Sequence, residues 1–383
     1  MPVKIKDKRK CCGCAACSNV CPKNCISMRM DDEGFYYPVV DEENCIHCDL
    51  CKKVCPVLNN PNDEVEVNPV FFAARSLDHG VRQNSSSGGI AYLLSKSFIS
   101  EGNAVCGVRM SPDLSHAEYV SVEDNENLSF LNGSKYLQSV PGDIFSRMQK
   151  LLSDEKKVLF IGTPCQVAGI KNYFKNDSEN IFYIDIVCHG VPSQLLWDKW
   201  SEYLVDENKS AVKSVNFRDK RNGWQEYGFS ANLENGKSLY FERKRGFLGL
   251  YLKNLCLRPS CGSCQHKGFN RCSDLTIADF WGIEKVLPDY EKKNGVSLVM
   301  VNTQRGEKML HSIREELEID EVDCKELFQS RNKTMLKSVT INGDRSRFMK
   351  DLKKKNIPQL EKKYLNRSFC SRLKRKLKRI VQK

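Results

Sequence analysis

The sequence of 383 residues lacks any apolar run long enough to span a lipid bilayer. Its first ten residues, MPVKIKDKRK, are charged and lack the hydrophobic segment of a secretory signal. These absences predict a cytoplasmic protein without a membrane span. The sequence contains 19 cysteines, and in a reducing compartment such a high count points to metal ligands rather than to disulfides.

The sequence also lacks an evenly spread positive charge, although its formal net charge is +12. Ten lysines and arginines and no acidic residue lie between Lys362 and Lys383, and the rest of the chain is nearly balanced. A nucleic-acid-binding surface is therefore not expected. The tail predicts either peripheral contact with the inner face of an anionic membrane through an amphipathic helix, or a solvated terminus. The apolar residues of this helix would be Phe369, Leu373, Leu377, Ile380 and Val381.

Composition divides the chain into four regions. Residues 1–58 are dense in cysteine, and residues 59–69 are polar, contain two prolines and are expected to form a linker. Residues 70–340 have the pattern of a mixed α/β domain, and residues 341–383 become basic and helical.

Two cysteine groups in the first region share the spacing C-x-x-C-x-x-C-x-x-x-C, and a proline follows each group. In two-cluster ferredoxins of the bacterial type, the fourth cysteine of each group ligates the other cluster. A pair of zinc sites is the alternative. The pattern predicts one 4Fe–4S cluster on Cys11, Cys14, Cys17 and Cys55, and another on Cys45, Cys48, Cys51 and Cys21.

A third cysteine group predicts a third 4Fe–4S cluster, with a zinc knuckle as the alternative. Four ligands could come from this segment alone, or the fourth could be Cys165 or Cys188, each at the end of a predicted strand. The group consists of Cys256, Cys261, Cys264 and Cys272. We expect Cys12 and Cys25, which lie outside every pattern, to be small buried residues.

The large region alternates strands and helices. Residues 157–161 (KVLFI) and 181–187 (IFYIDIV) are short apolar strands, each followed by a turn and a helical run, which predicts parallel β-α units. Ligands bind in such sheets where the carboxyl ends of the strands open into loops. The run after Gly89 predicts a capped helix, and Asn235-Gly236 predicts a hairpin turn. The expected fold class is thus α/β (α+β), with a small ferredoxin domain before a larger mixed domain.

Four segments of this sequence resemble the beta subunits of coenzyme F(420) hydrogenases and dehydrogenases. The resemblance covers roughly residues 1–290, including the two-cluster module in front, and its motifs occur in the expected order. The segments are GTPCQVAGI (162–170), DIVCHGVPS (185–193), CLRPSCGSC (256–264) and SDLTIADFWGI (273–283).

The resemblance implies a flavoprotein domain in which FAD lies beside a 4Fe–4S cluster. FAD would exchange a hydride with the deazaflavin and single electrons with the clusters. His189 is a candidate proton donor near the flavin, with a structural histidine as the alternative. The candidate FAD-binding residues are Ser87, Gly88 and Gly89 at a helix start, and Gly162, Thr163 and Gln166 after a strand.

Asn222, Gly223 and Trp224 are further candidates for stacking on the flavin, and Asp279, Phe280 and Trp281 match an acidic-aromatic motif of the family. For these residues, core packing is the alternative role.

We therefore expect an iron–sulfur flavoprotein oxidoreductase. Its partners would be a redox protein, such as a ferredoxin or a component of a hydrogenase or dehydrogenase, and a small-molecule hydride donor or acceptor. One alternative is a non-catalytic electron-carrier component of a larger redox or polysaccharide-biosynthesis system. A zinc-stabilised binding protein is another.

Overall fold

The computed structural model describes residue 3 and residues 7–64, 69–177 and 179–365. The apolar tail residues from Phe369 to Val381, predicted to form an amphipathic helix, lie outside the described residues. In the described part of the chain, no helix combines the length and the apolar character that crossing a membrane requires.

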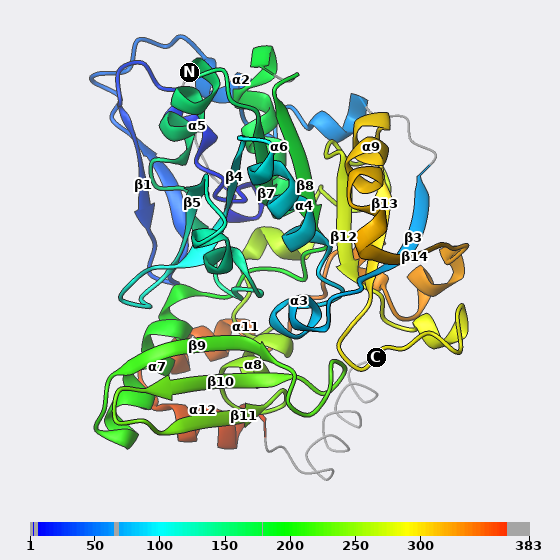
Figure 1. Ribbon diagram of the computed structural model, residues 1–383. Coiled ribbons are helices and arrows are strands. Elements are labelled where there is room, and N and C mark those ends of the chain that lie inside the picture. Colours follow the sequence, from blue (N-terminus) through cyan, green and yellow to red (C-terminus); the bar gives the residue numbers. More distant parts are fainter. Residues whose placement is uncertain (1–2, 4–6, 65–68, 178, 366–383) are drawn as a thin grey trace, which may run out of the picture.

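A nine-stranded mixed sheet forms the centre of the large region (Figure 1). Its inner strands β4, β7, β8 and β12 run parallel, and antiparallel strands flank them. In spatial order, the strands are β14 (Leu317–Glu321), β3 (Val70–Ser76), β13 (Ser297–Val301), β12 (Leu275–Asp279), β8 (Ile181–Ile186), β7 (Val158–Gly162), β4 (Ala104–Met110), β5 (Ala117–Val122) and β6 (Ser139–Val140).

Helices cover both faces of this sheet, because its central strands are apolar on both sides. In β7, Leu159 packs with α4 (Ile90–Ser100) and α9 (Gln304–Ser312) on one face. Val158 and Phe160 pack with α5 (Ile144–Ser153) and α6 (Pro164–Tyr173) on the other. The predicted β-α units around β7 and β8 are thus confirmed as parallel neighbours.

A second layer lies below the large sheet in Figure 1 and carries its own core. The predicted hairpin at Asn235-Gly236 is confirmed within it, between β10 and β11. Two helices that follow residue 340 pack into the same core and are not a free tail. The layer contains β9 (Val212–Asp219), β10 (Gly228–Leu233), β11 (Ser238–Glu242), α7 (Gln194–Asn208), α8 (Gly246–Leu252), α11 (Arg345–Leu352) and α12 (Ile357–Tyr364). Two further short helices are α3 (His79–Asn84) and α10 (Lys333–Leu336).

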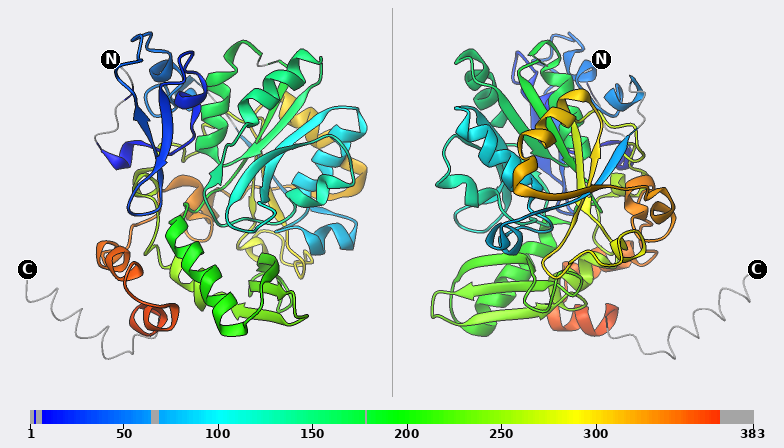
Figure 2. Two further views of the ribbon diagram at one scale, coloured as in Figure 1. Left: turned by 90° about the vertical axis from the view of Figure 1, so that its left-hand side faces the viewer. Right: turned by 45° about the vertical axis from the view of Figure 1, so that its right-hand side comes forward.

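The cysteine-rich N-terminal unit packs against the α6 side of the large sheet (Figure 2, left). It holds a hairpin of β1 (Ile26–Met30) and β2 (Tyr36–Val40) and two single-turn helices, α1 (Ala16–Asn19) and α2 (Leu50–Lys53). Close approach is possible because Gly169 in α6 has no side chain. A Cβ there would lie 2.9 Å from the Cys14 sulfur.

The segment after the N-terminal unit, predicted as a linker, is anchored where it is described. Asn62 is buried, and its side-chain oxygen accepts a hydrogen bond from the Cys272 amide at 2.9 Å. This contact fixes the path of the chain from the N-terminal unit to the large sheet.

Candidate functional site

The eight N-terminal cysteines line two small cavities in crossed groups. This grouping is the one expected if the fourth cysteine of each sequence group ligates the other cluster, so it supports the predicted assignment. Cys12 and Cys25 also border these cavities. One cavity is lined by Cys11, Cys14, Cys17 and Cys55, and the other by Cys21, Cys45, Cys48 and Cys51.

The two cysteine loops repeat one backbone conformation. Gly13 and His47 both have left-handed φ angles, of 74° and 54°. Ala15 and Asp49 occupy the next equivalent position at 61° and 60°, just before α1 and α2. The shared conformation at matched positions is what two loops of the same function require, and it costs energy for the residues that are not glycine.

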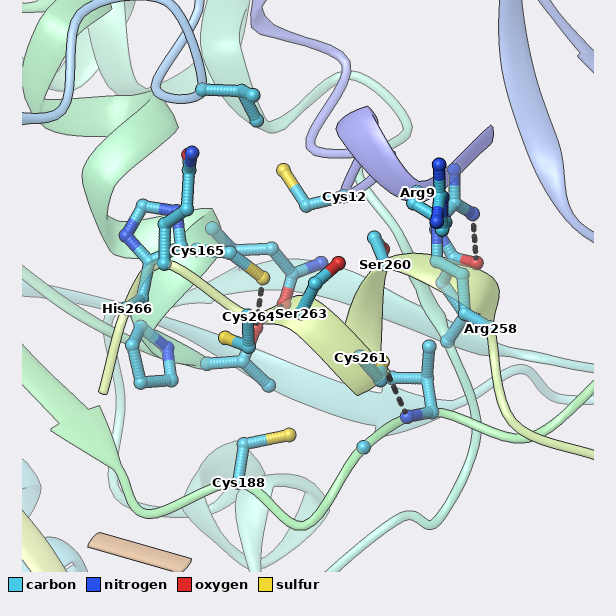
Figure 3. A pocket seen from close by; sticks show the side chains of 18 of the residues that line it. Arg9, Cys12, Cys165, Cys188, Arg258, Ser260, Cys261, Ser263, Cys264 and His266 are labelled. Atoms are coloured by element: carbon cyan, nitrogen blue, oxygen red, sulfur yellow. Dashed lines mark hydrogen bonds between the residues drawn. The ribbon is translucent and has the colours of Figure 1, made fainter. Parts of the chain in front are cut away.

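A third set of cysteines lines a larger cavity of about 340 Å³. We call it the thiol cavity; its cysteines are Cys12, Cys165, Cys188, Cys261 and Cys264. Figure 3 shows Cys12 on the wall formed by the N-terminal unit and the other four on the walls formed by the large region. Sequence patterns alone did not connect Cys12 with this set, because it stands outside every spacing.

Two strand ends and one loop bring the four cysteines of the large region together. Cys165 is in the first turn of α6 after β7, and Cys188 follows β8, so both lie at the carboxyl edge of the parallel sheet. Cys261 accepts a hydrogen bond at its sulfur from the Val191 amide at 3.4 Å. Gly190 permits this approach, since a Cβ there would lie 3.2 Å from the Cβ of Cys261.

The thiol arrangement suits a cube-shaped cluster. The four sulfurs surround a cavity, whereas a single zinc ion with bonds of about 2.3 Å draws four sulfurs around one point. No three histidine, cysteine or carboxylate side chains in the described ranges are placed to hold a single metal ion. Burial raises the pKa of the Cys188 and Cys261 thiols to about 12. Both thiols are therefore protonated at neutral pH without metal, and iron binding would release their protons.

Two predicted ligands of the third cluster lie elsewhere. Cys256 is fully buried in the core between α7, α8 and α11. Cys272 is buried beside α6 and β8, where its backbone amide donates to the Asn62 side chain and its carbonyl accepts a hydrogen bond from Lys171. Neither lines the thiol cavity, so a site built from the 256–272 segment alone is not supported. The neighbouring strand ends supply the two remaining thiols instead.

A second cavity of about 280 Å³ shares a wall with the thiol cavity. The wall contains residues 188–191, together with Thr163 and Gln166 from the loop after β7. The predicted FAD-binding residues that line the second cavity are Ser87, Gly89, Gly162, Thr163 and Gln166.

The helix start at residues 87–89 differs from the expected free cap. The Gly88 amide donates to the Ser297 hydroxyl at 3.0 Å, and the Ser87 hydroxyl donates to the Val296 carbonyl at 2.7 Å. No serine side chain caps α4; Gly89 occupies that position with a left-handed φ of 91°. Gly88 does not line the cavity, because it packs against β3 and β13.

Gln166 is fixed as part of the shared wall. Its carboxamide oxygen accepts hydrogen bonds from the Thr163 hydroxyl at 2.8 Å and the Tyr119 hydroxyl at 3.0 Å. Its amide nitrogen donates to the Ser139 carbonyl at 3.1 Å. These bonds hold the Gln166 side chain in one orientation, so it helps to fix the wall between the two cavities.

His189 lines both cavities, but its contacts favour a structural role. Asn254 donates its side-chain amide to the Thr340 carbonyl, so its oxygen faces His189 Nε2 at 2.7 Å and Nε2 carries the proton. Burial lowers the pKa of His189, which keeps the ring neutral near pH 7. A proton donor role would require breaking the bond to Asn254.

Two basic side chains in the second cavity were not predicted from the sequence. The Lys135 ammonium donates to the Phe130 and Asn132 carbonyls, which leaves one of its three N–H groups for a ligand. Buried Arg218 pairs with both oxygens of Asp279 at 2.6 and 3.0 Å, and its Nε has no partner among the described residues. The lining fits an anionic aromatic cofactor.

The acidic-aromatic motif performs a packing role in this structure. Asp279 also accepts a hydrogen bond from Trp224 Nε1 at 2.9 Å, and the Trp224 ring stacks on Trp281 at 4.5 Å. Trp224 and Phe280 are buried in the core. Of the motif, only Asp279 lines the second cavity.

Comparisons with known proteins agree with this architecture. Residues 155–326 match the family of the C-terminal region of the coenzyme F420 hydrogenase/dehydrogenase beta subunit, and residues 10–59 match the 4Fe-4S dicluster domain. A curated relative is one of the subunits of the F(420)H(2) dehydrogenase of Methanosarcina mazei. The alignment is 23% identical over 337 residues, and it covers 84% of this chain and 88% of the relative.

A similar solved structure is a xenon derivative of the F420-reducing [NiFe] hydrogenase complex from Methanosarcina barkeri. The match covers 66% of this chain and 81% of that chain, at 17% identity and a TM-score of 0.46. The chain thus combines a 4Fe–4S dicluster domain at its N-terminus with a region that matches the C-terminal region of the coenzyme F420 hydrogenase/dehydrogenase beta subunit, and it is an iron–sulfur electron-transfer protein related to that subunit.

Proposed function

We propose that this chain is an iron–sulfur flavoprotein oxidoreductase. In this proposal, Cys165, Cys188, Cys261 and Cys264 hold a third 4Fe–4S cluster in the thiol cavity. FAD binds in the second cavity. The chain then connects one-electron iron–sulfur carriers with a two-electron organic partner.

The observation that carries this proposal is the wall shared by the two cavities. Residues 188–191 border both spaces, and Cys188 itself supplies one of the four thiols. A group bound in the second cavity would therefore be a direct neighbour of a cluster in the first. A flavin interconverts two-electron and one-electron chemistry, which is the conversion such neighbours need.

The residues of the second cavity would bind and orient the cofactor. Lys135 offers an N–H donor, and an anionic phosphate or ring edge would stabilise its protonated, positively charged form. Arg218, whose charge is paired with Asp279, offers its Nε–H group. Leu137, Tyr251 and Ile277 provide apolar surface for an aromatic ring. Gln166 and its bonded neighbours keep the dividing wall in place.

The two cluster sites of the dicluster domain follow the thiol cavity in a defined order. The cavity around Cys11 borders the thiol cavity, because Lys10, Cys12 and Val57 line both spaces. The cavity around Cys45 lies farther along, where Cys48 is exposed. We therefore propose that a redox partner protein exchanges electrons at the Cys45 group, and that the organic partner reacts at the other end.

The organic partner proposed first is a deazaflavin of the coenzyme F420 type, because the curated relative is named as part of an F(420)H(2) dehydrogenase. Another small-molecule hydride donor or acceptor fits the same cavity chemistry. The proposed protein partner is a ferredoxin or a component of a hydrogenase or dehydrogenase complex.

Flavin release tests this proposal. The chain is purified anaerobically and denatured, and the released flavin is identified and quantified relative to protein. We expect FAD in a stoichiometric amount from the wild type and a loss of most of it from Lys135→Met, which removes the cavity's ammonium group.

Lys220→Met is the matched control. Lys220, like Lys135, is partly buried and donates to two backbone carbonyls, those of Arg82 and Asn294, but it does not line the second cavity. Its FAD content should equal that of the wild type. Wild-type protein that carries its clusters but releases no flavin would contradict the proposal and favour the electron-carrier alternative.

A further inference from the structure

Arg258 is a fully buried arginine at the junction between the dicluster domain and the thiol cavity. It begins the turn that carries Cys261, and its side chain reaches into the dicluster domain. Figure 3 shows it on the same side of the thiol cavity as Cys261. It therefore contacts the surroundings of two cluster sites at once.

The hydrogen bonds that the guanidinium of Arg258 makes with the described residues all lie in this junction. Nε donates to the Cys11 carbonyl at 2.8 Å, and Nη1 donates to the Gln138 side-chain oxygen at 2.9 Å. Nη2 donates to the Tyr36 carbonyl at 2.9 Å and to the Cys11 sulfur at 3.6 Å. The guanidinium also lies 4.3 Å from the Tyr37 ring centre.

The charge of Arg258 is not matched by a carboxylate. In the part of the chain that the structure describes, its hydrogen-bond acceptors are carbonyl and amide oxygens and one sulfur. A buried guanidinium without a counter-charge is costly. A 4Fe–4S cluster on four thiolates carries a net negative charge, which increases when the cluster is reduced.

We propose that Arg258 is a positioning residue that raises the reduction potential of the cluster on Cys11, Cys14, Cys17 and Cys55. Hydrogen bonds to cluster sulfurs and nearby positive charge both stabilise the more negative, reduced state. The Cys11 contact supplies both. The cluster at the junction is thereby a better acceptor for an electron than it would be beside a neutral side chain.

The proposal concerns the dicluster domain, so it holds whether or not FAD binds. It rests on the proposed function only for the view that the cluster on Cys11 is the one that faces the third. Failure of flavin binding would leave it standing.

The test is an anaerobic redox titration of the full chain, followed by EPR, in Arg258→Met and Arg258→Lys variants. A Cys11→Ser variant identifies the signal of the cluster concerned. We expect Arg258→Met to shift the midpoint potential of that cluster to a more negative value, and Arg258→Lys to give a smaller shift because it keeps the charge. The cluster on Cys45, Cys48, Cys51 and Cys21 should not shift.

Arg345→Met is the matched control, because Arg345 holds the same interface and its hydrogen-bond acceptors among the described residues are all oxygens. It pairs with both oxygens of Glu33 at 3.1 and 2.7 Å and donates to the Leu257 carbonyl. Its variant should keep the wild-type potentials. An equal shift in Arg345→Met, an unchanged potential in Arg258→Met, or loss of the Cys11 cluster from both Arg258 variants would each overturn the proposal in favour of a purely structural arginine.

Discussion

Lys135 gives the second cavity a charge that depends on pH. Burial lowers the pKa of its ammonium group to about 7, whereas the ordinary lysine value applies when the chain is unfolded. Between these two values, the unfolded chain holds a proton that the folded chain has lost. The free energy of unfolding should therefore rise with pH across this window.

We expect the apparent melting temperature of flavin-free wild-type protein to rise relative to that of Lys135→Met as the pH goes from 7 to 9. Below pH 7 the two should differ by a constant amount. If the melting temperatures of both proteins changed in parallel between pH 7 and 9, Lys135 would keep its proton in the folded state. Differential scanning fluorimetry under anaerobic conditions makes the comparison.

Single residues divide into those that a spacing reveals and those that only the fold places. The eight N-terminal cysteines follow a repeated spacing, and the structure groups them in the predicted crossed arrangement. Cys12, Lys135 and Arg258 carry no local signal, because their surroundings come from distant segments of the chain. Cys256 and Cys272 had a plausible spacing but are core residues.

At the scale of elements, the contact of α6 with the first cysteine loop holds the dicluster domain on the sheet. Ala16 and Val54 pack into the same core as Val167 and Ala168 of α6. Gly169 continues this contact opposite Cys14. One helix thus supplies Cys165 at its beginning and the docking surface along its length.

Gly169→Ala should loosen this contact. The added Cβ would lie 2.9 Å from the Cys14 sulfur and 3.0 Å from its Cβ, so the loop must shift. We expect a loss of stability of about 1–3 kcal/mol, typical of overpacking, and faster loss of cluster absorbance in air.

Gly343→Ala is the control for this change, since a Cβ at Gly343 would meet no atom within 4 Å. It should retain the wild-type melting temperature and cluster lifetime. Equal behaviour of both variants would contradict the close packing of α6 on the Cys14 loop.

The strands around β7 and β8 were predictable because short apolar runs before turn residues are characteristic of buried parallel strands. The start of α4 was not. Its serines fit a capping pattern, but β3 and β13 engage Ser87 and Gly88, so the chain turns at Gly89 instead. Tertiary contacts decided this helix start rather than local propensity.

Over the whole molecule, the segment after residue 340, which composition set apart from the large domain, packs against that domain and against the dicluster domain. Phe348 and Leu360, beyond the predicted domain end, belong to the core of the three-stranded layer. Arg345 from the same segment pairs with Glu33 of the dicluster domain. The composition of this segment shows its many basic residues but does not reveal the apolar helix faces that pack into the core.

The cavities follow one another from the exposed Cys48 to Lys135. This order could not be read from the sequence, since it depends on how the dicluster domain docks. The electron path proposed along these cavities requires that the thiol cavity hold a cluster of its own, with Cys12 as a neighbour and not a ligand.

Quantification of iron, acid-labile sulfide and zinc in the anaerobically purified full chain, with Mössbauer spectroscopy of the iron, tests this claim most directly. The account predicts three 4Fe–4S clusters per chain for the wild type and for Cys12→Ala, and two for Cys165→Ala. Two clusters in the wild type, zinc in place of the third, or loss of a cluster from Cys12→Ala with retention in Cys165→Ala would contradict it.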